Sequence, residues 1–143
     1  MKKLILGSIL LFGVLLLTGC GSQKEALLRC TATQSGVDVN LNVKFIGKKV
    51  DKMDLSYNMD LSGYNDTQIN AIGNQDFCTS VKNAMSQYSD AFTNCKQNIS
   101  NKHLVVTADF DIDKIATSEL DKMSSVEDAK TGLESAGYTC TVE

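Results

Sequence analysis

Two neighbouring stretches of strict alternation constrain the fold of this chain more than any other feature. In VDVNLNVKF, residues 37–45, every odd position is apolar and every even position is polar. Residues 50–61, VDKMDLSYNMDL, alternate in the same way from Met53 onward. A period of two puts the apolar side chains on one face of a β-strand and the polar side chains on the other. The pair therefore predicts antiparallel strands with one face buried and one face in water.

Further strands are expected on both sides of this pair. A weak strand precedes it at residues 26–33, and turns at 35–36 and 47–48 would join the three strands into a meander. The other expected strands cover residues 95–99, 103–112 and 138–142.

Two segments change to the period of a helix. In the first, an apolar stripe recurs every three or four residues, at Phe77, Val81, Met85, Tyr88 and Phe92. The second begins at Ser124 with Glu127 three residues later, which is the signature of a capping box, and Gly137 ends it. A single helical turn is expected near residues 68–72.

Together these elements predict an α+β fold. The expected order is β-β-β-α-β-β-α-β, with both helices packed on one face of an antiparallel sheet. Residues 26–143 have the length of a single domain. The formal net charge is −3 and no basic patch is present in the sequence, which argues against nucleic acid as a partner.

The N-terminus has the anatomy of an export signal. Lys2 and Lys3 supply a basic start, and residues 4–17 form an apolar core shorter than the ~20 residues that a spanning helix needs. The core ends in Leu17-Thr18-Gly19-Cys20, which resembles the lipobox of bacterial lipoproteins. The resemblance implies that the Cys20 sulfur receives a diacylglyceryl group and that cleavage occurs before Cys20. An ordinary secretory signal or anchor that happens to end in Cys is the alternative.

The lipobox divides the chain into three parts. Residues 1–19 are expected to be the lipoprotein signal peptide, residues 20–25 the lipidated Cys20 with a short tether, and residues 26–143 the domain. Acyl chains such as palmitate anchor by about 0.8 kcal/mol per buried methylene, and two chains hold stably where one does not. We therefore expect the protein in the cell membrane, on the extracytoplasmic face, with the lipid bilayer as partner through acylated Cys20.

The remaining cysteines are Cys30, Cys78, Cys95 and Cys140. An even number in an exported domain predicts two disulfides, and four reduced, buried thiols are the alternative. None of their spacings is C-x-x-C, which argues against a thioredoxin-like redox site and against a zinc site.

The expected first helix constrains how these cysteines pair. If residues 78–92 are one helix, they span on the order of 21 Å, whereas a disulfide holds its Cα atoms within ~7 Å. This length opposes a Cys78–Cys95 bridge. We prefer Cys30–Cys95 with Cys78–Cys140, because a second helix antiparallel to the first would bring Cys140 toward Cys78. The pairing of Cys30–Cys78 with Cys95–Cys140 stays open.

Few side chains suggest chemistry. Asp109, Asp111 and Asp113 have the spacing that begins a calcium loop, but the glycine and the late glutamate of an EF-hand are missing. The preferred interpretation is therefore that they lie on the solvent-exposed face of a strand. His103 has no Cys or Ser nucleophile beside it in sequence. We therefore expect no catalytic residue, no metal, no cofactor and no enzyme activity.

Three segments resemble the YehR-like small bacterial lipoproteins, namely KKVDKMDLSYNM, HLVVTADFDIDKI and SVEDAKTGLESAGYTC. The resemblance covers roughly residues 24–143 and implies no catalytic residues. The expected function is a noncatalytic envelope module that binds a protein or a wall component. The alternative is a small-molecule or ion receptor associated with a transporter. A deep apolar pocket would favour the receptor, and a flat, wet sheet face would favour the module.

Overall fold

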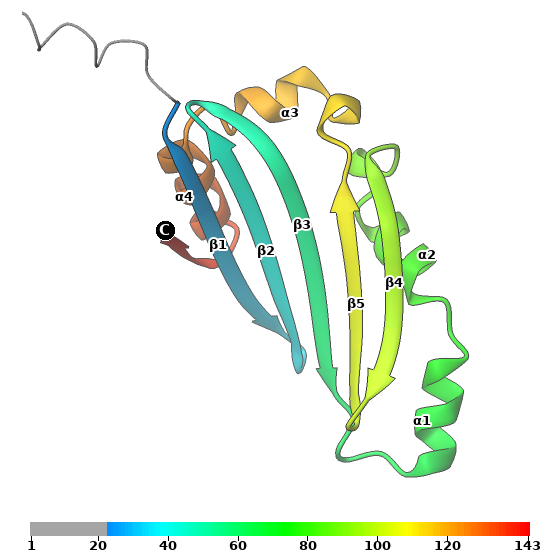
Figure 1. Ribbon diagram of the computed structural model, residues 1–143. Coiled ribbons are helices and arrows are strands. Elements are labelled where there is room, and N and C mark those ends of the chain that lie inside the picture. The colour runs from blue at the N-terminus through cyan, green and yellow to red at the C-terminus, as the bar shows by residue number, and fades with distance from the viewer. Residues whose placement is uncertain (1–22) are drawn as a thin grey trace, which may run out of the picture.

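The computed structural model describes residues 23–143, so the expected signal peptide and the lipidation at Cys20 lie outside the described residues. The chain forms a six-stranded antiparallel sheet in the order β4-β5-β3-β2-β1-β6 (Figure 1). The α+β fold expected from the sequence is confirmed. The strands are β1 (Glu25–Gln34), β2 (Val37–Ile46), β3 (Lys49–Asp60), β4 (Phe92–Ser100), β5 (His103–Phe110) and β6 (Thr139–Val142).

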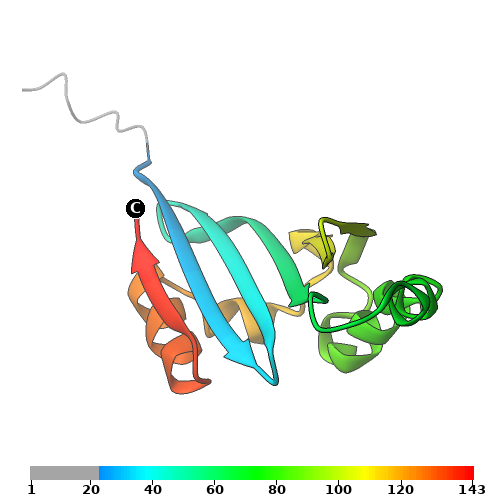
Figure 2. The same cartoon turned by 90° about the horizontal axis from the view of Figure 1, so that it is seen from below.

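The helices lie on one side of the sheet, as Figure 2 shows. They form two pairs, one inserted between β3 and β4 and the other between β5 and β6. Within residues 23–143 no helix is long and apolar enough to cross a membrane. The helices are α1 (Asp66–Gly73), α2 (Phe77–Ala84), α3 (Thr117–Asp121) and α4 (Val126–Ser135), with short 3₁₀ turns at Ser86–Tyr88 and Ile112–Lys114.

Tight turns set the register of the sheet. Ser35 and Gly36 join β1 to β2 with φ of 53° and 79°, and Asn101 and Lys102 join β4 to β5 with φ of 49° and 58°. Two consecutive residues with positive φ match the right-handed twist of the strands that they connect. The turn expected at residues 35–36 is confirmed, and both turns keep the apolar residues of the strands that they join on the same face.

The two faces of the sheet differ in chemistry. The apolar positions of β2 are buried toward the helices, whereas its alternate polar positions face outward on the side that carries no helix. On that outer face Asn42 Nδ2 donates a hydrogen bond to Asp54 Oδ1 over 3.0 Å, and Asp54 lies opposite Asp109 in the register. The alternation in the sequence therefore identifies correctly which residues are buried.

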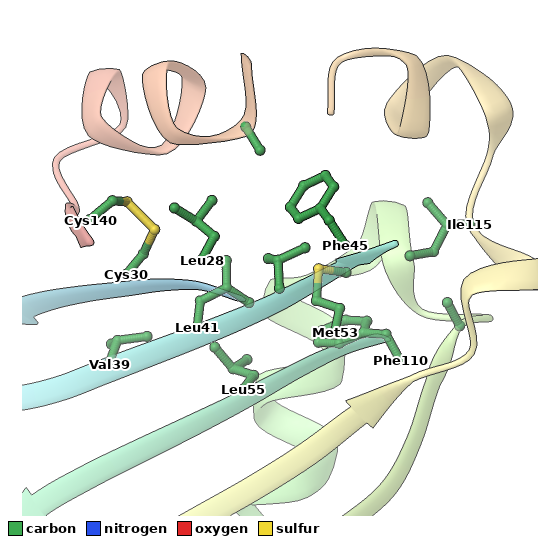
Figure 3. Packing of buried hydrophobic residues seen from close by; sticks show 13 residues of the cluster. Leu28, Cys30, Val39, Leu41, Phe45, Met53, Leu55, Phe110, Ile115 and Cys140 are labelled. Carbon is green, nitrogen blue, oxygen red and sulfur yellow. A yellow bond between two sulfur atoms is a disulfide. The ribbon is translucent and has the colours of Figure 1, made fainter. Parts of the chain in front are cut away.

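The larger part of the core lies between α3, α4 and the strands β1, β2 and β3 (Figure 3). Phe45 and Leu28 are fully buried there, and Ala129 of α4 packs over them. Phe110 closes the far side, where its ring meets the rings of Tyr88 and Phe92 edge-on at centroid distances of 6.2 and 5.7 Å.

A smaller core lies under α1 and α2. Leu61, Leu104 and Val106 are its buried members, and Ile69 of α1 and Phe77 of α2 pack against them. The two helix pairs cover different ends of the sheet, and Val81 of α2 packs against both cores.

The helix expected over residues 77–92 is interrupted, which corrects the sequence analysis. Its helical part ends at Ala84, because Met85 leaves helical geometry with φ of −105° and ψ of 44°. A 3₁₀ turn then carries Tyr88 toward Phe110, and Phe92 already belongs to β4. The apolar stripe is real, but it encodes contact with the core and not one continuous helix.

The other helices also differ in detail from the expectation. The single turn expected near residues 68–72 is a full helix, capped by reciprocal hydrogen bonds between Asn65 and Gln68. α3 was not expected at all. The second expected helix is present as α4, with Ser125 as its N-cap in place of Ser124.

The two disulfides are present, but the preferred pairing is wrong. The bridges are Cys30–Cys140 and Cys78–Cys95, with Cα–Cα distances of 4.1 and 5.8 Å. Cys30 and Cys140 lie directly opposite each other on the paired strands β1 and β6. Cys78 meets Cys95 because α2 is short and the chain doubles back after Met85, which removes the length argument against this bridge.

Candidate functional site

The two cores leave an apolar groove between them on the helix-covered face. Its volume is about 310 Å³. Its floor is formed by the inward side chains of β2, β3 and β5, and α2 provides one wall. The lining residues are Gln34, Ser35, Val37, Val39, Tyr57, Met59, Phe77, Val81, Leu104 and Val106.

The lengths of the helices explain why this part of the sheet is open. α4 packs against β1 and β6, and α2 packs against β4. The last residues of β3, including Tyr57 and Met59, lie between these two covered regions. Because helices of eight to ten residues span only about 12–15 Å, α2 and α4 leave this part of the sheet open.

The tight hairpin between β1 and β2 forms the outer end of the groove. Gln34 and Ser35 contribute polar groups at this rim, and Val37 and Val39 contribute the apolar side chains below them. This hairpin lies at the end of the sheet opposite to the point where the chain enters β1 (Figure 1). The groove is therefore far from Glu25, where β1 begins.

Tyr57 is the polar group within the apolar part of the groove. Burial raises the pKa of its phenol above the ordinary value, and the neighbouring Tyr138 raises it further. At neutral pH the phenol of Tyr57 is therefore uncharged and can donate one hydrogen bond. The groove lining contains no charged side chain, so an uncharged, apolar group is the occupant that its chemistry fits.

The wall that α2 forms is fastened to β4 by side chains. Gln97 of β4 accepts a hydrogen bond from the Phe77 backbone N–H over 2.9 Å and donates one to the Gln75 carbonyl over 2.8 Å. The Cys78–Cys95 disulfide makes the covalent link between the same two elements. Phe77 and Val81, the groove residues of α2, thus lie on either side of the disulfide in sequence.

The three aspartates singled out in the sequence do not form a cluster. Asp109 lies on the outer face of β5, Asp111 forms an ion pair with Lys114 at 3.3 Å, and Asp113 lies in the following 3₁₀ turn. In the part of the chain that the structure describes, no three carboxylate, cysteine or histidine side chains are grouped to hold a metal ion.

His103 lies exposed at the start of β5, beside the outer polar face. Its Nδ1 is 3.1 Å from Asn58 Oδ1, and Asp60 is its partner in the strand register. The environment is that of a solvated strand end. Cys20, the remaining site residue expected from the sequence, precedes the described residues.

The groove was not predicted from the sequence. The strand pattern places Tyr57 and Met59 in the core, and the helical stripe places Phe77 and Val81 on one face of a helix. Each assignment holds locally, but nothing in the spacing of these residues indicates that the two helix pairs stop short of each other. The signal available in the sequence was the number of apolar strand positions, which is larger than two short helices can cover.

Comparison with known proteins identifies no family for this chain. No family model matches the chain, and no curated protein matches it in sequence. The chain is similar to a solved NMR structure of a protein from Streptococcus pneumoniae TIGR4, at 15% identity and a TM-score of 0.48, over 99% of this chain and 97% of that one. The strands and helices themselves define the class, an α+β domain with a half-open apolar groove, and no activity follows from the likeness.

Proposed function

We propose that this protein is an extracytoplasmic lipoprotein, anchored in the cell membrane through Cys20, that serves as a noncatalytic binding module of the envelope. The observation that carries the proposal is the apolar groove between the two helix pairs, with Tyr57 within it. Its occupant is an apolar side-chain cluster of a partner protein. The lipobox at residues 17–20 supports the anchor.

The groove is open on one side and is not the deep pocket that would indicate a receptor, so its shape favours a protein partner. A volume of about 310 Å³ lies at the lower limit of sites that enclose a small molecule. The groove is also open on one side, so that a small ligand would keep much of its surface in water. Apolar anchors of a partner are suited to such a hollow, because the surrounding partner surface excludes the water.

The position of the groove fits a module that reaches away from the bilayer. β1 begins at Glu25, a few residues after Cys20, and ends at Gln34 on the groove rim. Ten residues of strand span about 30 Å. An anchor at the first end would therefore leave the groove accessible to partners in the envelope.

Site-specific photo-crosslinking in cells tests the groove. A photoreactive amino acid at Val37 would lie at the groove rim, and one at Thr107 on the outer face serves as a control. We expect a discrete protein adduct from position 37 and none from position 107. The adduct should disappear in a Val81→Arg variant that places a charge in the groove. Equal adducts from both positions would contradict the proposal.

The anchor is tested separately. A Cys20→Ala variant should no longer incorporate labelled fatty acid and should no longer sediment with membranes. Retention of both properties in the variant would refute the lipoprotein assignment.

A small-molecule receptor is the second candidate, and the polar groups of Gln34, Ser35 and Tyr57 on an otherwise apolar groove favour it. Native mass spectrometry of protein purified from its own membranes distinguishes the two. A bound compound of defined mass that is lost in the Val81→Arg variant would support the receptor and would contradict a protein partner as the occupant of the groove.

A further inference from the structure

The two disulfides have different exposure. Cys30 and Cys140 are 1% and 6% exposed and belong to the main core. Cys78 and Cys95 are only partly buried, and both border an open, shallow hollow on the surface. Attack on a disulfide requires a thiolate to reach one of its sulfurs, so access decides which bridge reacts. The second bridge is therefore the more exposed of the two.

We propose that Cys78–Cys95 is a site of thiol–disulfide exchange, with a dithiol of another protein as the reactant, and that its reduction releases α2. In this reaction the chain is the substrate and not the catalyst. The absence of a C-x-x-C spacing, which argues against a thioredoxin-like catalyst, is therefore compatible with the proposal.

The exchange takes place in two steps. A thiolate of the donor attacks Cys95 Sγ, a donor–Cys95 disulfide forms, the Cys78–Cys95 bond breaks, and its electron pair passes to Cys78 Sγ. Cys78 lies in the first turn of α2, where the helix N–H groups stabilise negative charge on the departing sulfur. The second donor thiol then displaces Cys95. The donor dithiol is oxidised to a disulfide, and Cys78 and Cys95 each gain one electron and one proton.

α2 depends on this bridge because the helix is short. It has eight residues, below the length at which a helix is stable by itself in water. Without the disulfide, α2 keeps its contacts with both cores, the two hydrogen bonds of Gln97 and the cap of Asp76. Closure of a loop of this size, with a separation of 17 residues, changes a local opening equilibrium by roughly 100-fold.

Release of α2 would open the apolar groove, and this part rests on the proposed function. Phe77 and Val81 provide the helical wall of the groove, and Cys78 lies between them in sequence. In the opened state of α2, which reduction makes more populated, the wall no longer has a fixed position relative to Tyr57 and Met59 on the floor. The oxidised form is then the one that binds a partner.

The test uses the full-length protein in mild detergent. Brief treatment with dithiothreitol, followed by alkylation and peptide mass spectrometry, should label Cys78 and Cys95 at least about tenfold faster than Cys30 and Cys140. Hydrogen exchange of the Met85 amide, which donates to the Val81 carbonyl, should accelerate about 100-fold on reduction. A Cys78→Ser/Cys95→Ser variant should show the same fast exchange, and Cys30→Ser/Cys140→Ser should not.

Two results would overturn the proposal, namely equal labelling of both disulfides and unchanged exchange of α2 after selective reduction. If the serine variant does not fold, hydrogen exchange of the wild-type protein reduced under native conditions still tests whether α2 is released.

The crosslink from position 37 separates this inference from the proposed function. An adduct that is lost on reduction supports both the proposed function and the control of the groove by the disulfide. An adduct that persists after α2 is released contradicts the control of the groove. Selective reduction with no adduct in either redox state refutes the proposed function alone.

Discussion

Asp76 stabilises the first turn of α2 through its charge. Its carboxylate accepts hydrogen bonds from the Thr79 N–H over 2.9 Å and from Thr79 Oγ1 over 2.7 Å. These bonds lower the pKa of Asp76 below its ordinary value. The pKa of Asp128 at the start of α4 is lowered in the same way, by the hydroxyls of Ser124 and Ser125. Both helix starts are therefore sensitive to acid.

The first prediction concerns stability against pH. Because these carboxylates have lower pKa values in the folded chain than in the unfolded chain, their contribution is complete above about pH 5 and is lost as the pH falls through about 4 and below. The urea midpoint should be flat from neutral pH to about pH 5 and then fall. Asp76→Asn should make the fall shallower, whereas Asp121→Asn, an exposed residue of α3, serves as control. Identical pH profiles for Asp76→Asn and the wild type would contradict the assignment.

Leu28 and Leu27 provide a matched pair on adjacent positions of β1. Leu28 is fully buried against α4, whereas Leu27 faces the other side of the sheet and is partly exposed. Leu28→Ala should cost about 2–5 kcal/mol of unfolding free energy, as is usual for a buried leucine. Leu27→Ala should cost clearly less. Urea unfolding measures both, and losses of equal size would mean that the faces of β1 are assigned wrongly.

At the level of elements, two glycines near the end of α4 should respond in opposite ways to substitution. Gly132 lies inside the helix with open space around it, so Gly132→Ala should stabilise by about 0.5–1 kcal/mol. Gly137 follows the helix with φ of 96°, a conformation that alanine disfavours. Gly137→Ala should therefore destabilise by about 1 kcal/mol or more. Thermal unfolding of the two variants provides the comparison, and shifts in the same direction would count against it.

The elements that could be predicted from the sequence are those whose own residues determine their buried face and their ends. The alternation in β2 and β3 fixes which side of each strand is buried, and the cap and glycine that bound α4 locate its ends. α2 could not be bounded in the same way, because Met85 and Tyr88 continue an apolar stripe after the helix has ended. A stripe records burial, and both a helix and a helix followed by a 3₁₀ turn can bury it.

The arrangement of the whole molecule was harder to predict from the sequence. Cys30 meets Cys140 because the last strand pairs with the first, a contact between residues 110 apart that no local pattern encodes. The groove depends likewise on how far two helix pairs lie from each other. The wrong disulfide pairing followed from one local error, because the assumed length of the first helix opposed the Cys78–Cys95 bridge.

The two disulfides should contribute differently to global stability. In the loop-entropy account, the bridge with a separation of 110 residues stabilises by about 4–5 kcal/mol and the bridge with a separation of 17 by about 3 kcal/mol. Cys30→Ala/Cys140→Ala should therefore lower the urea midpoint more than Cys78→Ala/Cys95→Ala. Because Cys30 and Cys140 are also buried in the core, their replacement by alanine removes packing as well, which adds to the difference between the two variants. The reverse order would contradict this account.

The path of β1 also has a mechanical consequence. Its first end leads toward the proposed anchor, and its other end leads into the hairpin at the groove. A partner pulled away from the bilayer would thus load β1 along its own axis, between β2 and β6, which run antiparallel to it on either side. Under such shear the hydrogen bonds on both sides must fail together and not one after another, and the Cys30–Cys140 bridge prevents β6 from sliding. The domain would then act as a stiff spacer that passes tension to the membrane without unravelling.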